Sequence, residues 1–435
     1  MATAGGRWPD LPPELLTSIG KRLATRIDVL QFRSTCSSWR SSLPLEQAPP
    51  APPPLPFPII RLLLPHPPAH YALTQATVYR LEPLHNPSNS PPKSWLIKVS
   101  ESNLPHGNRM RLLNPLSTDI ITPLPGNFPR ILDLSQFRIS EVCRSWSLGI
   151  EYEVDHQDDF NPAFIAQHNV NMVYKSVLLP LSGSNDIMLV VIRSGGQLSA
   201  MRLGDERWIR FVEGQDKNYS DLINFKGKIY ALSLEGDFLV IDSSLNITEY
   251  SSPLDPPARN RRYLVESCGE LWLLNSRWIV PPSNDDRFGL MTETWEIAKF
   301  AWNEIAIWFL VFKLDEEEHK WVEVPDVGDR ILFAGRDCSF TVSAADFEGN
   351  CKGNCIFFLN DACNTFDENY HDDYDALRGS GGKEPEIYLL GDRSVDRLVA
   401  YPGYANLFWP LPSWLALGPE RWSASHHACS SSSQP

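Results

Sequence analysis

Residues 226–232 read KGKIYAL and residues 268–274 read CGELWLL, and the fold follows from this recurring pattern. In each copy a glycine, Gly227 or Gly269, stands before a short run of β-branched, aromatic and large aliphatic residues. Runs of this kind, bounded by turn residues, are typical of β-strands. Residues 353–359, GNCIFFL, form a looser third copy. The chain therefore repeats one strand-and-turn unit.

The spacing of the copies indicates the architecture. Gly227 and Gly269 lie 42 residues apart, and repeats of about 40–50 residues built from strands and turns are the size of a β-propeller blade. One blade is a small sheet that cannot bury both faces alone, so neighbouring blades must stack on it. Further strand-like runs occupy residues 186–192, 228–232, 238–241, 270–274 and 308–314. We therefore predict an all-β domain over residues 59–418, a β-propeller with degenerate blades whose number the sequence does not give.

Three other stretches of the chain have their own patterns. Residues 311–324 predict a hairpin with an acidic tip at residues 315–318. Residues 291–307 interrupt the strand pattern and are interpreted as a helical insertion or a loop. Residues 419–435, which end in the low-complexity sequence SASHHACSSSSQP, are predicted to be a disordered tail.

The beginning of the chain has a helical rather than a strand period. The apolar positions are Leu15, Leu16, Ile19 and Leu23 in a first helix, and Val29, Phe32, Cys36, Trp39 and Leu43 in a second. Pro12 and Pro13 suit a first helical turn, where a missing N–H costs little. The second helix is predicted to start at Asp28, because its carboxylate can cap the helix with Gln31 three residues on. Pro44 is predicted to end it.

A proline-rich stretch divides these two regions. Residues 44–58 read PLEQAPPAPPPLPFP, and such a composition favours an extended, semi-rigid polyproline II spacer. A ligand for a proline-binding domain is the alternative interpretation. We predict a helical module at residues 7–44, a proline-rich linker at residues 45–58 and the β domain after it.

Composition limits the class of function. The formal net charge of −14 makes general nucleic-acid binding unfavourable, since phosphate backbones are repelled. The helical module is the local exception: it carries Arg7, Lys21, Arg22, Arg26, Arg33 and Arg40 against Asp10, Glu14 and Asp28. An acidic protein partner and a merely solubilising surface explain this equally well. No signal peptide or transmembrane run is recognised, so the eight cysteines are expected to stay reduced in the nucleus, the cytoplasm or both.

Motifs of known chemistry are missing from the sequence. It has no G-x-S-x-G elbow, H-E-x-x-H motif or P-loop. Cys351, Cys355 and Cys363 lack the paired short spacings of a zinc site, so a buried core cysteine is favoured at Cys355. The acidic run at residues 367–375 lacks the central Gly and terminal Glu of an EF-hand loop, which favours a solvated loop. We predict no catalytic residues, no metal site and no cofactor.

The helical module resembles an F-box. The order Leu11-Pro12-x-Glu14-Leu15-Leu16-x-x-Ile19, then Leu23, then Asp28-Val29-Leu30, then FRSTCSSWR at residues 32–40 carries the resemblance. Thr35 departs from the valine usual in that family, and the joint at residues 24–27 is short. The resemblance implies docking on a Skp-type adaptor. The contact positions that it implies are Leu11, Pro12, Leu15, Leu16, Ile19, Leu23, Val29, Leu30, Phe32, Cys36 and Trp39.

The rest of the chain resembles the plant F-box family with a kelch-like (KIB-type) C-terminal β-propeller. The matching pieces lie at residues 226–232, 264–271, 311–315, 320–324, 353–358 and 409–415, in the family's order. The resemblance implies a non-catalytic substrate-recognition subunit of an SCF-type (Skp–cullin–F-box) E3 ubiquitin ligase. The F-box would bind the adaptor and, through it, a cullin, and the propeller would bind a target protein that the sequence does not identify. The alternatives are a protein-binding propeller outside any ligase and a carbohydrate-binding propeller with a helical cap.

Overall fold

The structure is a computed structural model, and it describes most of the chain between residues 11 and 408. The segments inside this range that it does not describe are 24–25, 45–68, 85–93, 105–106, 119, 122–133, 153–172, 206, 211–216, 253, 255–260, 280–305, 348–350, 360–384, 399–400, 402–403 and 405–406. The predicted linker, the acidic run at 367–375, Cys363, the tail and almost all of residues 291–307 therefore lie outside the described residues. No helix among the described residues is long and apolar enough to cross a membrane.

The helical module contains three helices rather than the two that the sequence predicted. They are α1 (Pro13–Gly20), α2 (Arg26–Ser34) and α3 (Ser37–Ser42). The predicted second helix breaks at Cys36, whose backbone is extended with φ −166° and ψ 175°. Just before the break the hydroxyl of Ser34 donates to the carbonyl of Gln31 at 2.7 Å. Short polar side chains such as serine compete with the backbone for hydrogen bonds in this way, which explains the interruption.

The ends of these helices confirm one prediction and correct another. Pro13 begins α1, with Pro12 as the residue before it, as the sequence predicted. The second helix, however, starts at Arg26, so that Asp28 lies inside its first turn and is not the capping residue. A carboxylate in the first turn still complements the positive end of the helix dipole.

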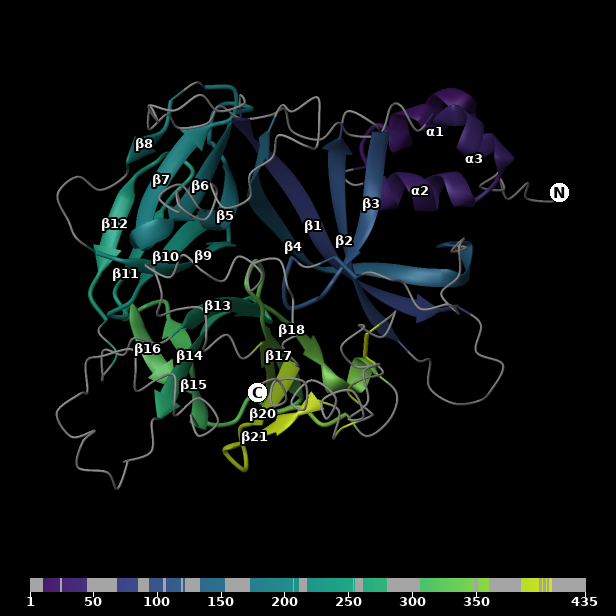
Figure 1. Ribbon diagram of the computed structural model, residues 1–435. Helices are drawn as coiled ribbons and strands as arrows, with labels where there is room; N and C mark the ends of the chain where they lie inside the picture. The colour runs from purple at the N-terminus through teal and green to yellow at the C-terminus, as the bar shows by residue number, and fades with distance from the viewer. Residues whose placement is uncertain are drawn as a thin grey trace, which may run out of the picture.

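The described β domain forms four hydrogen-bonded sheets of eight, four, four and five strands. The eight-stranded sheet comprises two blades, so we divide the domain into blades 1 to 5 (Figure 1). Blade 1 contains β1 (Ala69–Pro83), β2 (Trp95–Leu104), β3 (Gly107–Leu113) and β4 (Phe137–Tyr152), with the short 3-10 helix η3 (Leu134–Gln136) before β4. Blade 2 contains β5 (Val173–Pro180), β6 (Ile187–Arg193), β7 (Gln197–Arg202) and β8 (Ile209–Arg210), with η6 (Ser194–Gly196) between β6 and β7. Blade 3 contains β9 (Tyr219–Phe225), β10 (Lys228–Ser233), β11 (Phe238–Ile241) and β12 (Ile247–Tyr250).

The last two blades complete the described part of the domain. Blade 4 contains β13 (Arg262–Ser267), β14 (Glu270–Ile279), β15 (Ala306–Asp315) and β16 (Lys320–Glu323). Blade 5 contains β17 (Arg330–Ala334), β18 (Phe340–Ser343), β19 (Cys355–Leu359), β20 (Pro385–Leu389) and β21 (Ser394–Arg397), with η8 (Ala344–Asp346) after β18. Blades 1 and 2 are joined into one eight-stranded sheet through a single pair, Trp146 with Ser176.

The blades close into a ring. Strands β4, β5, β9, β13 and β18 are the innermost, because each one contacts the next and β18 contacts β4 again. Each pair of neighbouring blades also shares its own hydrophobic cluster, including the pair formed by blades 5 and 1. Because each sheet buries both faces against its neighbours, the ring solves the burial problem that one blade cannot solve alone. The predicted β-propeller is confirmed, and five blades are counted in the described residues.

The first two copies of the sequence repeat form the same turn, between the first and second strands, in blades 3 and 4. Lys226 and Gly227 connect β9 to β10 with φ values of 50° and 73°, and Cys268 and Gly269 connect β13 to β14 with values of 53° and 77°. Two successive positive φ values are typical of the tight type I′ turn that suits a β-hairpin. The third copy is different, because β19 pairs in parallel with β17 rather than following a hairpin. The hairpin predicted at residues 311–324 is formed by β15 and β16.

The end of the described chain returns to blade 1. The amide of Leu96, on β2, donates to the carbonyl of Leu407 at 2.6 Å, and Leu96 forms a parallel bridge with Phe408. Phe408 is 2% exposed and packs in the cluster between blades 1 and 5. The ring is thus fastened by residues close to both ends of the β domain.

Candidate functional site

A small core holds the three helices of the helical module together. Leu16, Val29, Phe32 and Leu43 are buried at its centre, and Leu11, Leu23 and Trp39 pack against them. The rings of Phe32 and Trp39 lie 4.6 Å apart at an angle of 38°. At Gly20 a Cβ atom would come within 2.7 Å of Leu43, so the glycine lets α1 approach the end of α3 closely. The apolar positions that recur with a helical period in the sequence therefore mostly form the core of the module.

A second set of apolar side chains faces away from this core. Leu15 is 52% exposed and Ile19 is 39% exposed, although both are large hydrophobic residues. They lie four residues apart on α1, so they share one face of the helix, and the exposed Pro12 precedes them. Exposed apolar groups that are gathered on a small module are typical of a docking surface. We call Pro12, Leu15 and Ile19 the apolar face of α1.

The eleven predicted contact residues thus divide by their environment. Pro12, Leu15 and Ile19 are exposed. Leu11, Leu23, Leu30, Cys36 and Trp39 are half-buried, and Leu16, Val29 and Phe32 are buried. Docking by these positions stays a prediction, and the buried ones act first as core residues of the module.

Among the described basic side chains of the module, that of Arg33 is used inside the module. The guanidinium of Arg33 donates to the carbonyl of Arg40 at 2.9 Å and also to that of Leu43. Since these bonds satisfy carbonyls at the end of α3, Arg33 acts inside the module. Lys21 and Arg22 remain exposed directly after the apolar face, where positive charge would favour an acidic partner.

The helical module is seated directly on blade 1. Ile27, on α2, is 7% exposed and packs in one cluster with Tyr79, Leu81, Ile97 and Val99 of β1 and β2. The helix α2 also contacts η3, and Figure 1 shows the three helices beside β2 and β3. The module is therefore held against the propeller.

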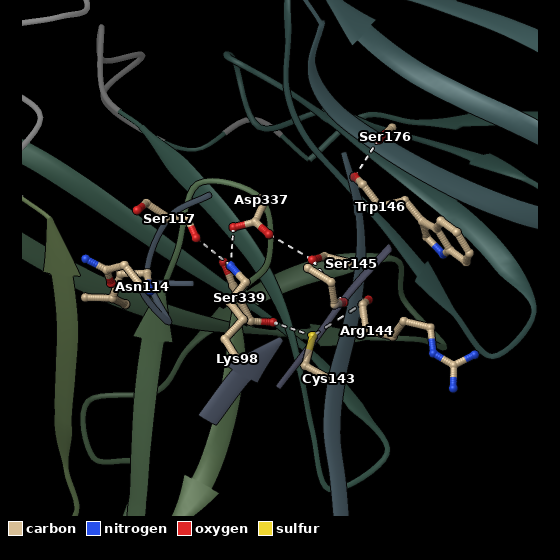
Figure 2. A network of polar contacts seen from close by, with 12 residues as sticks. Lys98, Asn114, Ser117, Cys143, Arg144, Ser145, Trp146, Ser176, Asp337 and Ser339 are labelled. Carbon is tan, nitrogen blue, oxygen red and sulfur yellow. Dashed lines mark hydrogen bonds and ion pairs between the residues drawn. The ribbon is translucent and has the colours of Figure 1, made fainter. Parts of the chain in front are cut away.

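A network of buried polar groups lies between blades 1 and 5 (Figure 2). The ammonium of Lys98, on β2, lies 2.7 Å from the carboxylate of Asp337 and donates to the carbonyl of Ser117 at 2.8 Å. The hydroxyl of Ser145, on β4, donates to the other oxygen of Asp337 at 2.8 Å. Burial would raise the pKa of Asp337, but Lys98 and Ser145 outweigh it and hold this pKa below its ordinary value. Both groups therefore stay charged, and they fasten the first blade to the last.

A second ion pair links the inner strands of blades 2, 3 and 4. The ammonium of Lys175, on β5, lies 2.9 Å from the carboxylate of Asp221, on β9. The amide of Leu264, on β13, donates to the other carboxylate oxygen at 2.6 Å. Burial alone would lower the pKa of Lys175, but attraction by Asp221 keeps it above its ordinary value. The role of both ion pairs is structural, because their polar atoms are used in joining blades.

Sequence reasoning missed these pairs and the contact of Ile27. The only local signal was a single lysine inside an apolar strand, as in the order Trp95-Leu96-Ile97-Lys98-Val99. Its partner is distant in the sequence and could not be named. Within the described residues no group of three or more His, Cys, Asp or Glu side chains is placed to hold a metal ion. Cys355, predicted to be a core cysteine, is fully buried in β19.

Comparison with known proteins agrees with this architecture. A family model described as the KIB1-4 beta-propeller matches residues 70–384, which is most of the chain and begins with β1. The chain belongs to the KIB1-4 β-propeller family. The family resemblance deduced from the sequence is thereby confirmed.

Similar proteins from Arabidopsis thaliana are named F-box proteins. F-box protein SKIP23 is 31% identical over 420 residues, which cover 94% of this chain and 95% of that protein. F-box protein At2g17036 is 28% identical over 421 residues, covering 95% and 96%. F-box/kelch-repeat protein At1g64840 is 27% identical over 366 residues, covering 81% and 84%. The chain thus has the organisation of a plant F-box protein with a propeller.

Proposed function

We propose that this chain is the substrate-recognition subunit of an SCF-type E3 ubiquitin ligase. Its F-box binds a Skp-type adaptor and, through the adaptor, a cullin, while the propeller binds the protein that is to be ubiquitinated. The chain itself makes and breaks no bond. It acts by raising the effective concentration of the target near the ubiquitin-conjugating enzyme. Such a complex would operate in the nucleus, the cytoplasm or both.

The observation that carries this proposal is the apolar face of α1. Leu15 and Ile19 are exposed while their neighbour Leu16 is 0% exposed. The helix therefore does not need these two side chains for its own core. Removing an apolar side chain from water contributes about 1.5–3 kcal/mol when burial is complete. Contact with an adaptor would bury the side chains of Leu15 and Ile19, which are exposed in the chain alone.

The seating of the module on blade 1 adds a geometric consequence to the proposal. Ile27 packs against the propeller on α2, whereas Leu15 and Ile19 lie on α1 and stay exposed. The module thus has one surface for its own propeller and another for the adaptor. Adaptor and target would then be bound by two parts of the chain that pack against each other.

Co-purification of the full chain with a Skp-type adaptor tests adaptor docking. Leu15→Ala and Ile19→Ala should each weaken binding about tenfold, because about 1.4 kcal/mol corresponds to a factor of ten. Val322→Ala is the matched control, since Val322 is also 52% exposed but lies on β16 of the propeller. The control should bind as the wild type does.

Two results would overturn the assignment. If the wild-type chain and the adaptor do not co-purify, the ligase function is wrong. If the double variant Leu15→Ala/Ile19→Ala binds as tightly as Val322→Ala, the docking surface lies elsewhere. Both conclusions require that the wild-type chain is folded, which its circular dichroism verifies.

A further inference from the structure

The outer strand of blade 3 is an exposed edge of its sheet. The strand β12 pairs with β11 on one side only. Ile247, Thr248 and Glu249 are all exposed, and the exposed fraction of Ile247 is 43% although it is a large hydrophobic residue. Figure 1 shows β12 at the rim of the propeller, across the ring from the three helices. A partner bound to β12 would therefore leave the apolar face of α1 accessible.

The hydrogen bonds of the hairpin determine which backbone groups β12 offers. The amide of Asp242 donates to the carbonyl of Asn246 at 3.1 Å. Hydrogen-bonded and non-hydrogen-bonded pairs alternate along antiparallel strands, so Thr248 is bonded to β11 whereas Ile247 and Glu249 are not. The N–H and C=O groups of Ile247 and Glu249 therefore point away from β11. They form the row of donors and acceptors with which an added strand pairs.

The outer strands of the other blades are shorter, covered or differently charged. The strand β8 has only two residues. The edge of β3 is partly covered, because the amide of Ile121 donates to the carbonyl of Leu112 at 2.9 Å. The strands β16 and β21 carry Lys320 and Arg397, and basic side chains are among the features that keep an exposed edge unpaired. The strand β12 has neither a basic side chain nor a proline, and its single charged side chain is acidic.

The side chains of β12 indicate the chemistry of the partner. Ile247 and Glu249 lie on the same face, because successive side chains of a strand alternate between its two faces. Glu249 and Asp237 share the ammonium of Lys217, which lies 3.4 Å from the carboxylate of Asp237. Two carboxylates are thus paired with one cation. On an added strand, a basic side chain opposite Glu249 and an apolar one opposite Ile247 would form favourable cross-strand pairs.

The charge of the surrounding blades favours the same kind of partner. Residues 219–323, which span blades 3 and 4, contain 18 Asp and Glu but only 10 Lys and Arg. Three exposed Glu residues, 316–318, lie at the tip between β15 and β16. This tip is close to β12, because the ring centres of His319 and Tyr250 are 4.0 Å apart. The acidic surface repels a second copy of the chain and attracts a basic segment.

We propose that the edge of β12 binds an extended basic segment of the target protein as an added β-strand. The segment has Lys or Arg opposite Glu249 and, two residues away, an apolar residue opposite Ile247. Hydrogen bonds to the backbone of Ile247 and Glu249 contribute affinity, and the two side chains contribute specificity. This inference rests on the proposed function, because it takes the bound protein to be the one that is ubiquitinated.

A synthetic peptide of the repeating order Lys-Thr-Val-Thr tests the proposal. When it is extended, its lysine and valine side chains lie on one face, as the β12 edge requires. Isothermal titration calorimetry with the full chain, in the absence of adaptor, should detect binding. A peptide of the repeating order Glu-Thr-Val-Thr should not bind, because its carboxylates are repelled by Glu249 and its surroundings.

Two substitutions separate the β12 edge from general attraction to an acidic surface. Glu249→Gln should weaken binding of the Lys-Thr-Val-Thr peptide about tenfold, as expected when a charge-assisted hydrogen bond is lost. The matched control is Glu270→Gln. Glu270 is also paired with a lysine, and its side chain is 39% exposed against 38% for Glu249. The control should bind the peptide as the wild type does.

Methylation of the peptide backbone tests strand addition. Only every second amide of an added strand faces its neighbour. Methylating one alternating set of amides should therefore abolish binding, and methylating the other set should preserve it. On the protein, Ile247→Pro removes a donor that points away from β11, so β12 should remain paired while peptide binding is lost.

Four results would overturn the proposal. The first is that the folded wild-type chain does not bind the Lys-Thr-Val-Thr peptide. The second is that Glu249→Gln and Glu270→Gln weaken binding equally, and the third is that the two methylated peptides do not differ. The fourth is that the chain alone sediments as a dimer that Ile247→Pro dissociates, since β12 would then bind a second copy. None of these measurements contains the adaptor, so their failure is distinct from a failure of adaptor docking, which co-purification detects.

Discussion

The ammonium of Lys98 lies 2.7 Å from the carboxylate of Asp337, and the two side chains are only 0% and 6% exposed. Removing one partner of such a pair leaves a buried charge without compensation, which typically costs about 3–5 kcal/mol. We therefore expect Lys98→Met to lower the free energy of unfolding by roughly that amount. Urea unfolding followed by circular dichroism measures the change.

A matched control for this variant is Lys320→Met. Lys320 also pairs with a carboxylate, that of Glu318, but both groups are exposed at the tip between β15 and β16. Exposed pairs contribute little to stability, so this variant should unfold as the wild type does. In the double variant Lys98→Met/Asp337→Asn no uncompensated charge remains, and part of the lost stability should return. Equal losses in Lys98→Met and Lys320→Met would contradict a structural role for the buried pair.

The same pair should make stability depend on pH at both extremes. The folded protein holds the pKa of Asp337 below 3.8, so this carboxylate stabilises the fold above that pH, and the contribution is lost as the pH falls further. The pKa of Lys98 is raised above 10.5, so its contribution is complete below that pH and is lost as the pH rises beyond it. Asp337→Asn should therefore flatten the acid limb of a plot of unfolding free energy against pH. An unchanged acid limb would show that other carboxylates govern acid unfolding.

Gly335 is expected to be intolerant of any side chain. The Cβ atom of Gly335→Ala would lie 2.2 Å from the carbonyl oxygen of Cys338, and a backbone atom cannot give way as a flexible side chain can. Overpacking of this kind costs about 1–3 kcal/mol. The control is Gly391→Ala, whose Cβ atom would meet nothing closer than 3.9 Å. Thermal unfolding of the two variants should differ clearly, and similar Tm values would refute the steric argument.

Substitutions at two adjacent residues of α1 should distinguish a residue needed for folding from one available for docking. Leu16→Ala removes a fully buried side chain and should cost the helical module about 2–5 kcal/mol. Leu15→Ala removes a largely exposed one and should leave the stability of the module unchanged. Hydrogen exchange of the amides of α1 and α2 in the full chain measures both effects. Faster exchange in Leu15→Ala would mean that Leu15 belongs to the core after all.

The seat of the module on the propeller depends on Ile27. Ile27→Ala should weaken the contact with blade 1 by roughly 2–5 kcal/mol, the usual cost of truncating a buried isoleucine. Limited proteolysis should then cut the chain faster between α3 and β1. Met110→Ala is the control, because Met110 is 38% exposed on β3 of the same blade. Equal cleavage rates in the two variants would indicate that other contacts hold the module.

The all-β architecture could be predicted because its signals are local. The glycines of two hairpin turns, Gly227 and Gly269, and the apolar runs after them lie within seven-residue windows. The same windows could not give the number of blades, because the strands of blade 5 are not all joined as hairpins: β19 pairs in parallel with β17. No local pattern distinguishes such a parallel neighbour from the next strand of a hairpin.

The docking face could be predicted only as a set of helical positions. Spacing groups Leu15, Leu16 and Ile19 together, although the structure buries Leu16 and exposes the other two. Helical periodicity gives the direction of a side chain but not the element that covers it. The break at Cys36 was missed for a related reason, because polar residues next to it compete for backbone hydrogen bonds. The partners of Lys98 and Ile27 depend on long-range closure of the chain, which no sequence window contains.

The bridge between Leu96 and Phe408 also constrains when this protein can finish folding. Blades 2 to 4 consist of strands that are consecutive in the chain, so they can form while synthesis continues. Blade 1 receives its last neighbour only when Leu407 and Phe408 have been made and have left the ribosome. Until then the apolar face of blade 1 that carries Val78 and Leu96 lacks the part of its cover that Leu407 and Phe408 provide. A premature stop before residue 407 would keep the contact of β18 with β4 but remove Leu407 and Phe408 from the seam, so that Leu96 would lose its backbone partner and part of its apolar cover.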